Sequence, residues 1–133
     1  MTDGGWTSAT IDCAPIGPRS QPVIRGVVLD AAHQAFIAVF QYRTANEHGF
    51  FYATSADLIR WSAPQLLLAV DLPADAGKGQ AYAGYPSIID QTSPDRNFGS
   101  VGKTASLVFV RFKPFGQRSV SRELVAIPLQ IKD

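Results

Sequence analysis

The stretch Phe36-Ile37-Ala38-Val39-Phe40-Gln41-Tyr42-Arg43 gives the clearest indication of fold in this sequence. It is rich in aromatic and β-branched residues, which favour β-strands. Side chains alternate between the two faces of a strand, so the even-numbered residues from Phe36 to Tyr42 share one face, and Ile37 and Val39 share the other. Both faces are therefore largely apolar. Such a strand is expected to lie between two other layers, as in a sandwich or a propeller.

Three further apolar runs of strand length surround this stretch. They cover residues 23–29, 50–54 and 66–70, and turn-forming residues such as Asn46 to Gly49 separate them. Short apolar runs divided by turn chemistry are typical of antiparallel meanders. The sequence therefore predicts a first, four-stranded, blade-like sheet over residues 23–70.

The second half of the chain repeats this organisation after a Gly/Ala/Pro/Asp-rich loop over residues 71–84. Strands are expected at residues 85–90, 106–112 and 124–129, which form a second blade-like sheet over residues 85–131. Pro128 cannot donate a hydrogen bond to a neighbouring strand, so the last strand should lie at a sheet edge. The expected fold is all-β, with two antiparallel propeller-blade-like sheets and about seven strands. It is not a closed propeller within one chain.

Composition places the chain among globular proteins. It has 133 residues, of which 46% are hydrophobic and 17% are charged, and its net charge is +1. This length suits a single domain, and residues 1–22 are interpreted as an irregular arm because glycines and prolines interrupt them. No basic block stands out, so no nucleic-acid partner is expected.

Cysteine content and hydropathy bound the environment of the protein. Cys13 is the only cysteine, which excludes an intrachain disulfide, and a small idle thiol is expected there. Neither a signal peptide nor a stretch of membrane-spanning length is seen. No membrane partner is therefore expected, and the cytoplasm is the default localisation.

The segment from Phe51 to Pro64, with the pattern Ser55-x-Asp57-Leu58-x-x-Trp61, forms a recognisable motif. Ser55 and Asp57 can bond backbone groups in a tight turn, and Leu58 and Trp61 are expected to fold under as an apolar plug between sheets. The segment resembles a blade motif of the five-bladed β-propeller glycosidases, namely the arabinanases, xylosidases and fructosidases. The resemblance covers about residues 23–131, or roughly two blades.

The resemblance implies catalytic carboxylates on the innermost strands. At the matching positions this chain has Gly26 and Tyr85 instead. Asp30 and Asp90 each end an expected innermost strand, where turn bonding accounts for them. They are nevertheless the candidate catalytic pair if the two sheets face each other. The sequence thus favours a chain that is not an enzyme.

The remaining candidates belong to a binding surface. Polar, basic and aromatic side chains that hold sugars by hydrogen bonds and stacking are found at Arg25, His33, Tyr85 and Arg111. We therefore predict a possible carbohydrate ligand. No pattern of metal ligands or of a cofactor site is seen, so neither a metal nor a cofactor is expected.

Three hypotheses of function remain from the sequence. The first is a non-catalytic module related to glycosidase propellers, which binds carbohydrate or serves as an assembly unit. The second is a glycoside hydrolase whose site forms between subunits. The third is a fragment of a larger propeller. Strands that are apolar on both faces also predict a homo-oligomer, with a symmetric dimer favoured.

Overall fold

The computed structural model describes residues 23–131 except residues 78 and 116–118, and for residues 23–25 it describes the backbone. The predictions of an irregular arm over residues 1–22 and of an idle thiol at Cys13 concern residues outside this part of the chain. The described residues form eight strands: β1 (Val23–Asp30), β2 (Ala35–Arg43), β3 (His48–Ser55), β4 (Gln65–Ala69), β5 (Tyr82–Asp90), β6 (Ser100–Val101), β7 (Ala105–Phe115) and β8 (Ser119–Pro128).

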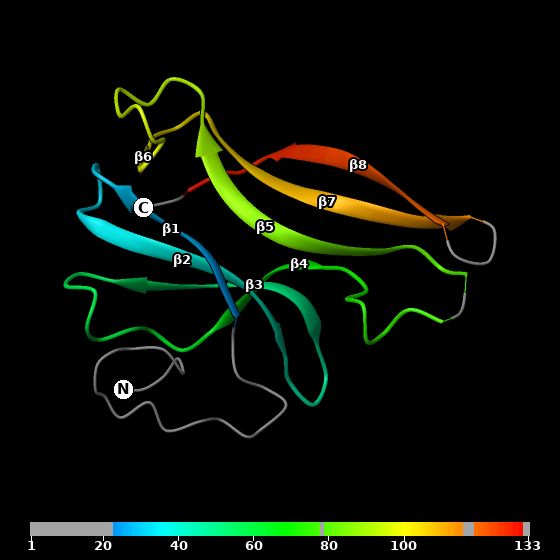
Figure 1. Cartoon of the computed structure of the whole chain (residues 1–133). Helices are drawn as coiled ribbons and strands as arrows, with labels where there is room; N and C mark the ends of the chain where they lie inside the picture. The colour runs from blue at the N-terminus through cyan, green and yellow to red at the C-terminus, as the bar shows by residue number, and fades with distance from the viewer. Residues whose placement is uncertain (1–22, 78, 116–118, 132–133) are drawn as a thin grey trace.

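The strands form two sheets, which cross at an angle in Figure 1. The five-stranded sheet has the order β4-β3-β2-β1-β6, and the three-stranded sheet has the order β5-β7-β8. Neither order returns to its first strand, so neither sheet closes into a ring. This confirms the predicted all-β fold with two sheets and no closed propeller. The sequence missed β6, which pairs with β1 in parallel and joins the first sheet from the second half of the chain.

The two faces of the five-stranded sheet carry separate apolar clusters, as the alternation along residues 36–43 predicts. The inner face, which is turned toward the three-stranded sheet, contributes Ile37, Val39 and Phe50 to the main core. There they join Leu107 and Phe109 of the other sheet, and the Phe50 and Phe109 rings meet at 5.2 Å. The second cluster lies on the outer face and is formed by Ala38, Phe40, Tyr42, Phe51, Ala53 and Trp61.

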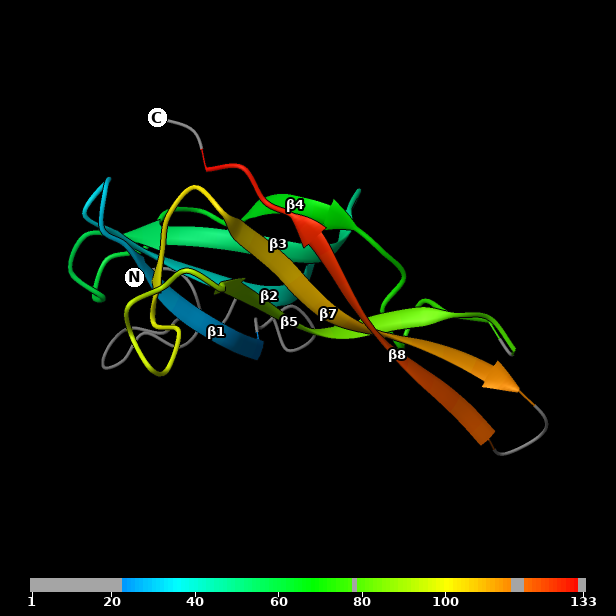
Figure 2. The ribbon, with the colours of Figure 1, turned by 90° about the horizontal axis from the view of Figure 1, so that it is seen from above.

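The three-stranded sheet is buried mainly on one face. Along β7, Ala105, Leu107 and Phe109 are buried, while the alternating residues Val108 and Val110 are half-buried. Beyond them the paired ends of β7 and β8 project past the five-stranded sheet (Figures 1 and 2). The strand order places β8 at an edge, as Pro128 predicts.

The turn from Ser55 to Trp61 uses the two polar residues of the motif as expected. The Ser55 hydroxyl accepts hydrogen bonds from the backbone N–H groups of Asp57 and Leu58. The Asp57 carboxylate accepts hydrogen bonds from the N–H groups of Arg60 and Ile59, which lower its pKa. These side-chain bonds satisfy backbone N–H groups of the turn locally.

The apolar half of that motif is arranged differently from the prediction. Leu58 is 44% exposed and adopts a positive φ of 66°, so it is not part of a plug. Trp61 is buried, but it packs in the outer cluster of the five-stranded sheet instead of between the two sheets. The physical reason is the turn itself, because the side-chain bonds of Ser55 and Asp57 set the chain's direction before Trp61 is reached.

The loop between β4 and β5 is anchored to the β2–β3 hairpin by ionic contacts. Arg43 donates to Asp75, and the His48 Nε2 atom lies 3.1 Å from Asp71. Burial alone would raise the pKa of Asp75, but the Arg43 guanidinium and the Leu72 N–H outweigh this effect and lower it. Within the described residues, no helix is long and apolar enough to cross a bilayer.

Candidate ligand-binding site

An aromatic cluster lies where β5 begins to pair with β7. The Tyr82 ring stacks on Phe112 with centroids 4.9 Å apart and planes at 17°. The Tyr85 ring lies 6.0 Å from Phe112, and the Arg122 guanidinium lies 5.7 Å from the centre of the same ring. We call Tyr82, Tyr85, Phe112 and Arg122 the aromatic cluster. Phe112 is buried beneath the others, whereas Tyr85 is 55% exposed.

A β-bulge positions Tyr85 in this cluster. Gly84 pairs with Val110 and Ser87 pairs with Val108, so Tyr85 and Pro86 together face a single residue of β7. Pro86 has no N–H to donate to the ladder, which accounts for the interruption. The Tyr85 N–H instead donates to the Gln41 side chain of β2 at 3.1 Å. The bulge therefore fixes Tyr85 at the junction of the two sheets.

The backbone of Tyr85 is strained. Its φ is 57°, in the left-handed region that bulky residues rarely adopt. Such a conformation costs about 1–3 kcal/mol and persists where the surrounding structure enforces it, often at functional sites. Leu58 and Phe98 are also exposed with a positive φ, so the feature that distinguishes Tyr85 is its ring contact with Phe112.

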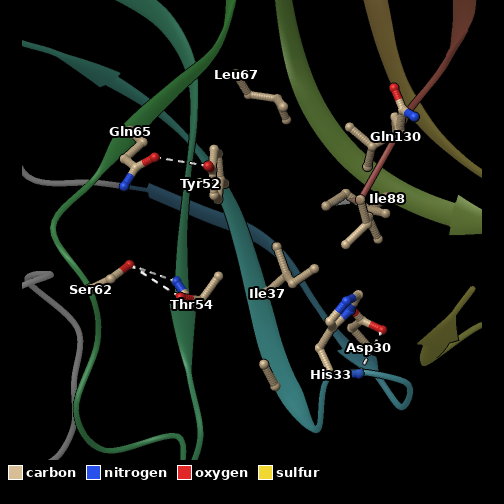
Figure 3. Close-up of a pocket in the computed structure, with 13 residues that line it drawn as sticks. Asp30, His33, Ile37, Tyr52, Thr54, Ser62, Gln65, Leu67, Ile88 and Gln130 are labelled. Carbon is tan, nitrogen blue, oxygen red and sulfur yellow. Dashed lines mark hydrogen bonds and ion pairs between the residues drawn. The ribbon is translucent and has the colours of Figure 1, made fainter. Parts of the chain in front are cut away.

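A pocket of about 500 Å³ lies between the inner face of the five-stranded sheet and the chain around Ile88 and residues 129–131. Asp30 and His33 lie at one end of it (Figure 3). Asp30 is buried, and its carboxylate lies 2.5 Å from His33 Nδ1 and 3.4 Å from the His33 backbone nitrogen. The turn after β1 therefore brings these two predicted residues together. We call this cavity the inter-sheet pocket.

Two hydrogen-bonded pairs form one wall of the inter-sheet pocket. The Tyr52 hydroxyl donates to the Gln65 side-chain oxygen at 2.9 Å. The Ser62 hydroxyl accepts a hydrogen bond from the Thr54 N–H at 2.9 Å. Figure 3 shows both pairs on the side opposite Ile88, and Ile37 lies between the Thr54–Ser62 pair and Ile88. The pocket thus has a polar wall and an aliphatic wall.

Asp90 is occupied by structural hydrogen bonds. It is buried, and it accepts hydrogen bonds from the Thr104 and Thr92 hydroxyls and from the N–H groups of Thr92 and Gly102. These four bonds hold the pKa of Asp90 well below its usual range. A carboxylate held ionised by four donors suits the turn between β5 and β7 and is a poor proton donor.

The two candidate acids lie beside the same short strand but face different surroundings. Asp30 pairs with Val101 in the parallel ladder, and the next residue, Gly102, donates its N–H to Asp90. Asp30 lines the inter-sheet pocket, and the described lining of that pocket does not include Asp90. The side chains that surround each carboxylate are therefore different, although the sequence suggested one pair.

The predicted binding residues are distributed over different parts of the molecule. Tyr85 belongs to the aromatic cluster, and His33 lies in the turn after β1. Arg111 lies on β7, where its guanidinium is 3.5 Å from Glu123, and it lines a separate hollow with Tyr82 and Asp71. Arg25 lies in β1, and its side chain falls outside the described part of the structure. The three predicted residues with described side chains thus do not form one site.

Several residues of these sites were not predicted from the sequence. Phe112 and Arg122 were not singled out, although their cross-strand pairing places them on one face of the three-stranded sheet. Tyr52 and Thr54 alternate with the buried Phe51 and Ala53, so strand periodicity could have placed both on the inner face. The contribution of Gln65 and Ser62 depends on how the Ser55–Trp61 turn directs the chain, which periodicity does not reveal.

The fold and these two sites define an all-β, two-sheet protein with an exposed aromatic cluster and an amphipathic pocket. Among the described residues, no group of three or more histidine, cysteine or acidic side chains could hold a metal ion. Comparisons with protein-family models, with curated proteins and with solved structures give no match to this chain.

Proposed function

We propose that this protein is a non-catalytic module, related to the blades of glycosidase propellers, that binds carbohydrate through its aromatic cluster. The observation that carries the proposal is the exposed Tyr85, held by a strained bulge beside Phe112 and Arg122. Aromatic rings offer large contact area with little loss of side-chain freedom, and a neighbouring cation can donate hydrogen bonds to hydroxyl groups. A sugar ring, with apolar faces and hydroxyl edges, matches this combination.

The non-catalytic part of the proposal rests on the carboxylates. Glycoside hydrolysis needs an acid and a second carboxylate, placed about 5–10 Å apart around the bond to be cleaved. Asp30 is the one carboxylate in the described lining of the inter-sheet pocket, and Asp90 accepts four structural hydrogen bonds. Turnover of aryl glycosides that is lost in Asp30→Asn or Asp90→Asn would overturn this part and support the hydrolase hypothesis.

Carbohydrate binding is tested on a glycan array, followed by titration calorimetry with the glycans that bind. Tyr85→Asn removes the ring and suits the positive φ, since asparagine tolerates that region. We expect it to weaken binding roughly tenfold, the effect of losing one aromatic contact of about 1.4 kcal/mol. Phe98→Asn is the matched control, because Phe98 is also exposed with a positive φ of 55°. An array without saturable binding would contradict the proposal.

Self-association is a second candidate function, favoured by the outer face of the three-stranded sheet. On this face Val110 pairs with Leu124 and Val108 pairs with Ala126, and Leu124 is 74% exposed. An exposed apolar face beside an edge strand is typical of an interface between subunits. Light scattering at micromolar concentration should give the mass of a dimer, and Leu124→Arg should give a monomer. A monomeric wild-type mass would exclude this function.

A further inference from the structure

The inter-sheet pocket is independent of the aromatic cluster and has the size of a ligand site. Its volume of about 500 Å³ falls in the range of about 300–1,000 Å³ that small-molecule sites occupy. The described residues that line it come from β1 to β5 and from the segment after β8. A site with walls from both sheets is formed by the tertiary fold and not by one local segment.

The polar wall of the pocket has groups suited to a hydroxyl. The Ser62 oxygen accepts hydrogen bonds from the Thr54 N–H and hydroxyl, so by valence its own proton remains to be donated. The Tyr52 hydroxyl donates to the Gln65 side-chain oxygen and retains acceptor lone pairs, while the Gln65 amide group carries two donor hydrogens. A hydroxyl group, which both donates and accepts, fits this wall.

The opposite wall requires an apolar ligand body. This wall is largely aliphatic and comes from β5 and from the segment that follows β8, which contribute Ile88, Leu129 and Ile131 beside the amide of Gln130. Ile37 and Leu67 add apolar surface on the side of the five-stranded sheet. Burying an apolar ring here yields roughly 25 cal/mol for each Å² removed from water. A ligand with hydroxyl groups on all sides would lose hydrogen bonds against this wall.

The charges around the pocket select against an ionised ligand. Its described lining contains no lysine or arginine, and its one carboxylate, Asp30, lies against His33. An anionic ligand would therefore leave water without a lysine or arginine to pair with, and the one carboxylate that could pair with a cation already lies against His33, so an ionised ligand loses hydration at a cost. An uncharged ligand avoids this cost.

From these three features we infer that the inter-sheet pocket binds a small uncharged molecule with an apolar ring body and a hydroxyl on one edge, such as a phenol or cyclic alcohol. The ring lies against Ile88 and Leu67, and the hydroxyl meets Ser62. This site differs in place and in ligand chemistry from the carbohydrate site at Tyr85.

The test uses 2-naphthol as the probe, in titration calorimetry with the full chain at neutral pH. We expect saturable binding of one 2-naphthol per chain, and binding about 3- to 10-fold weaker for 2-methylnaphthalene, which has the same size but no hydroxyl. Ser62→Ala should abolish the difference between the two compounds. The anion 2-naphthoate should bind more weakly than 2-naphthol.

Two tryptophan substitutions locate the probe. Leu67→Trp fills the pocket and should weaken 2-naphthol binding at least tenfold, while Leu58→Trp, at an exposed turn, should leave it unchanged. Ser62→Ala preserves the aliphatic wall, so it remains decisive if Leu67→Trp prevents folding. The inference is wrong if 2-naphthol does not saturate, if 2-naphthoate binds as tightly, or if Ser62→Ala keeps the preference for the hydroxyl. Tyr85→Asn should leave 2-naphthol binding intact.

Discussion

The two sheets have similar strand patterns but different surroundings. In the five-stranded sheet, β2 and β3 are buried on both faces, and each face belongs to its own apolar cluster. In the three-stranded sheet, the inner face is buried along β7 at Leu107 and Phe109, whereas Leu124 on the outer face is 74% exposed. The difference shows that an apolar strand pattern predicts where apolar side chains lie but not what covers them.

The largest effect expected from this comparison comes from the shared core. Phe50 is fully buried on the inner face and contacts Phe109, so Phe50→Ala should lower the free energy of unfolding by about 3–5 kcal/mol. Leu124→Ala should change it by less than about 0.5 kcal/mol, because that side chain is mostly in water. Urea denaturation measures both. A large loss in Leu124→Ala would mean that the outer face is covered in solution.

Alanine substitutions at one glycine in each sheet compare how tightly the two backbones are packed. Gly49 in β3 has a φ of 146°, and an added Cβ would collide with the Leu68 carbonyl of the neighbouring strand. Gly49→Ala should therefore cost about 1–3 kcal/mol. At Gly84 in β5, an added Cβ meets Gln41 and Phe112 at 3.4 and 3.8 Å, so Gly84→Ala should cost less than about 1 kcal/mol. Equal losses of thermal stability in Gly49→Ala and Gly84→Ala would contradict this prediction.

The contribution that the loop between the two sheets makes to stability should depend on pH through Asp75. Because the pKa of this carboxyl is lowered in the folded state, its contribution is complete above the ordinary value of 3.8 and is lost as the pH falls through the folded pKa. Asp75→Asn should cost about 1 kcal/mol at pH 7, with the loss disappearing at strongly acidic pH.

Urea denaturation of wild type and Asp75→Asn across this pH range tests the prediction. Asp71→Asn is the control, since Asp71 is more exposed and should contribute less. A loss in Asp75→Asn that is the same at every pH would show that the Arg43 contact does not stabilise the loop.

The smallest effect on stability is expected at the candidate carbohydrate site. Tyr85→Asn relieves a strained backbone and removes a side chain that is mostly exposed, so the free energy of unfolding should stay the same or rise by up to about 1 kcal/mol. A decrease of more than about 2 kcal/mol would show instead that Tyr85 is mainly a packing residue. Thermal unfolding, measured alongside the glycan titrations, distinguishes a binding role of Tyr85 from a packing role.

Most of the strands could be predicted because their information is local. The alternation over residues 36–43 correctly indicated a strand buried on both faces, and Pro128 correctly indicated an edge. The two-residue strand β6 could not be predicted, because its only signal is its pairing with Leu29 and Asp30, 71 residues earlier in the chain. The position of Trp61 likewise depended on the direction of a turn.

The candidate sites were less accessible from the sequence. The contact between Asp30 and His33 could be predicted, since one turn joins the two residues. The aromatic cluster joins Tyr82, Phe112 and Arg122 through cross-strand register, and the bulge at Tyr85 shifts that register. A shift of this kind cannot be derived from residue types alone.

The sequence by itself determined the all-β class, the division into two sheets and the apolar character of both strand faces, because side-chain alternation and turn chemistry act over a few residues. The tertiary structure alone decided which faces are covered, where the inter-sheet pocket lies and which side chains meet Tyr85. Those features depend on contacts between distant segments, and the free energy of such contacts is set by packing and register after the strands have formed.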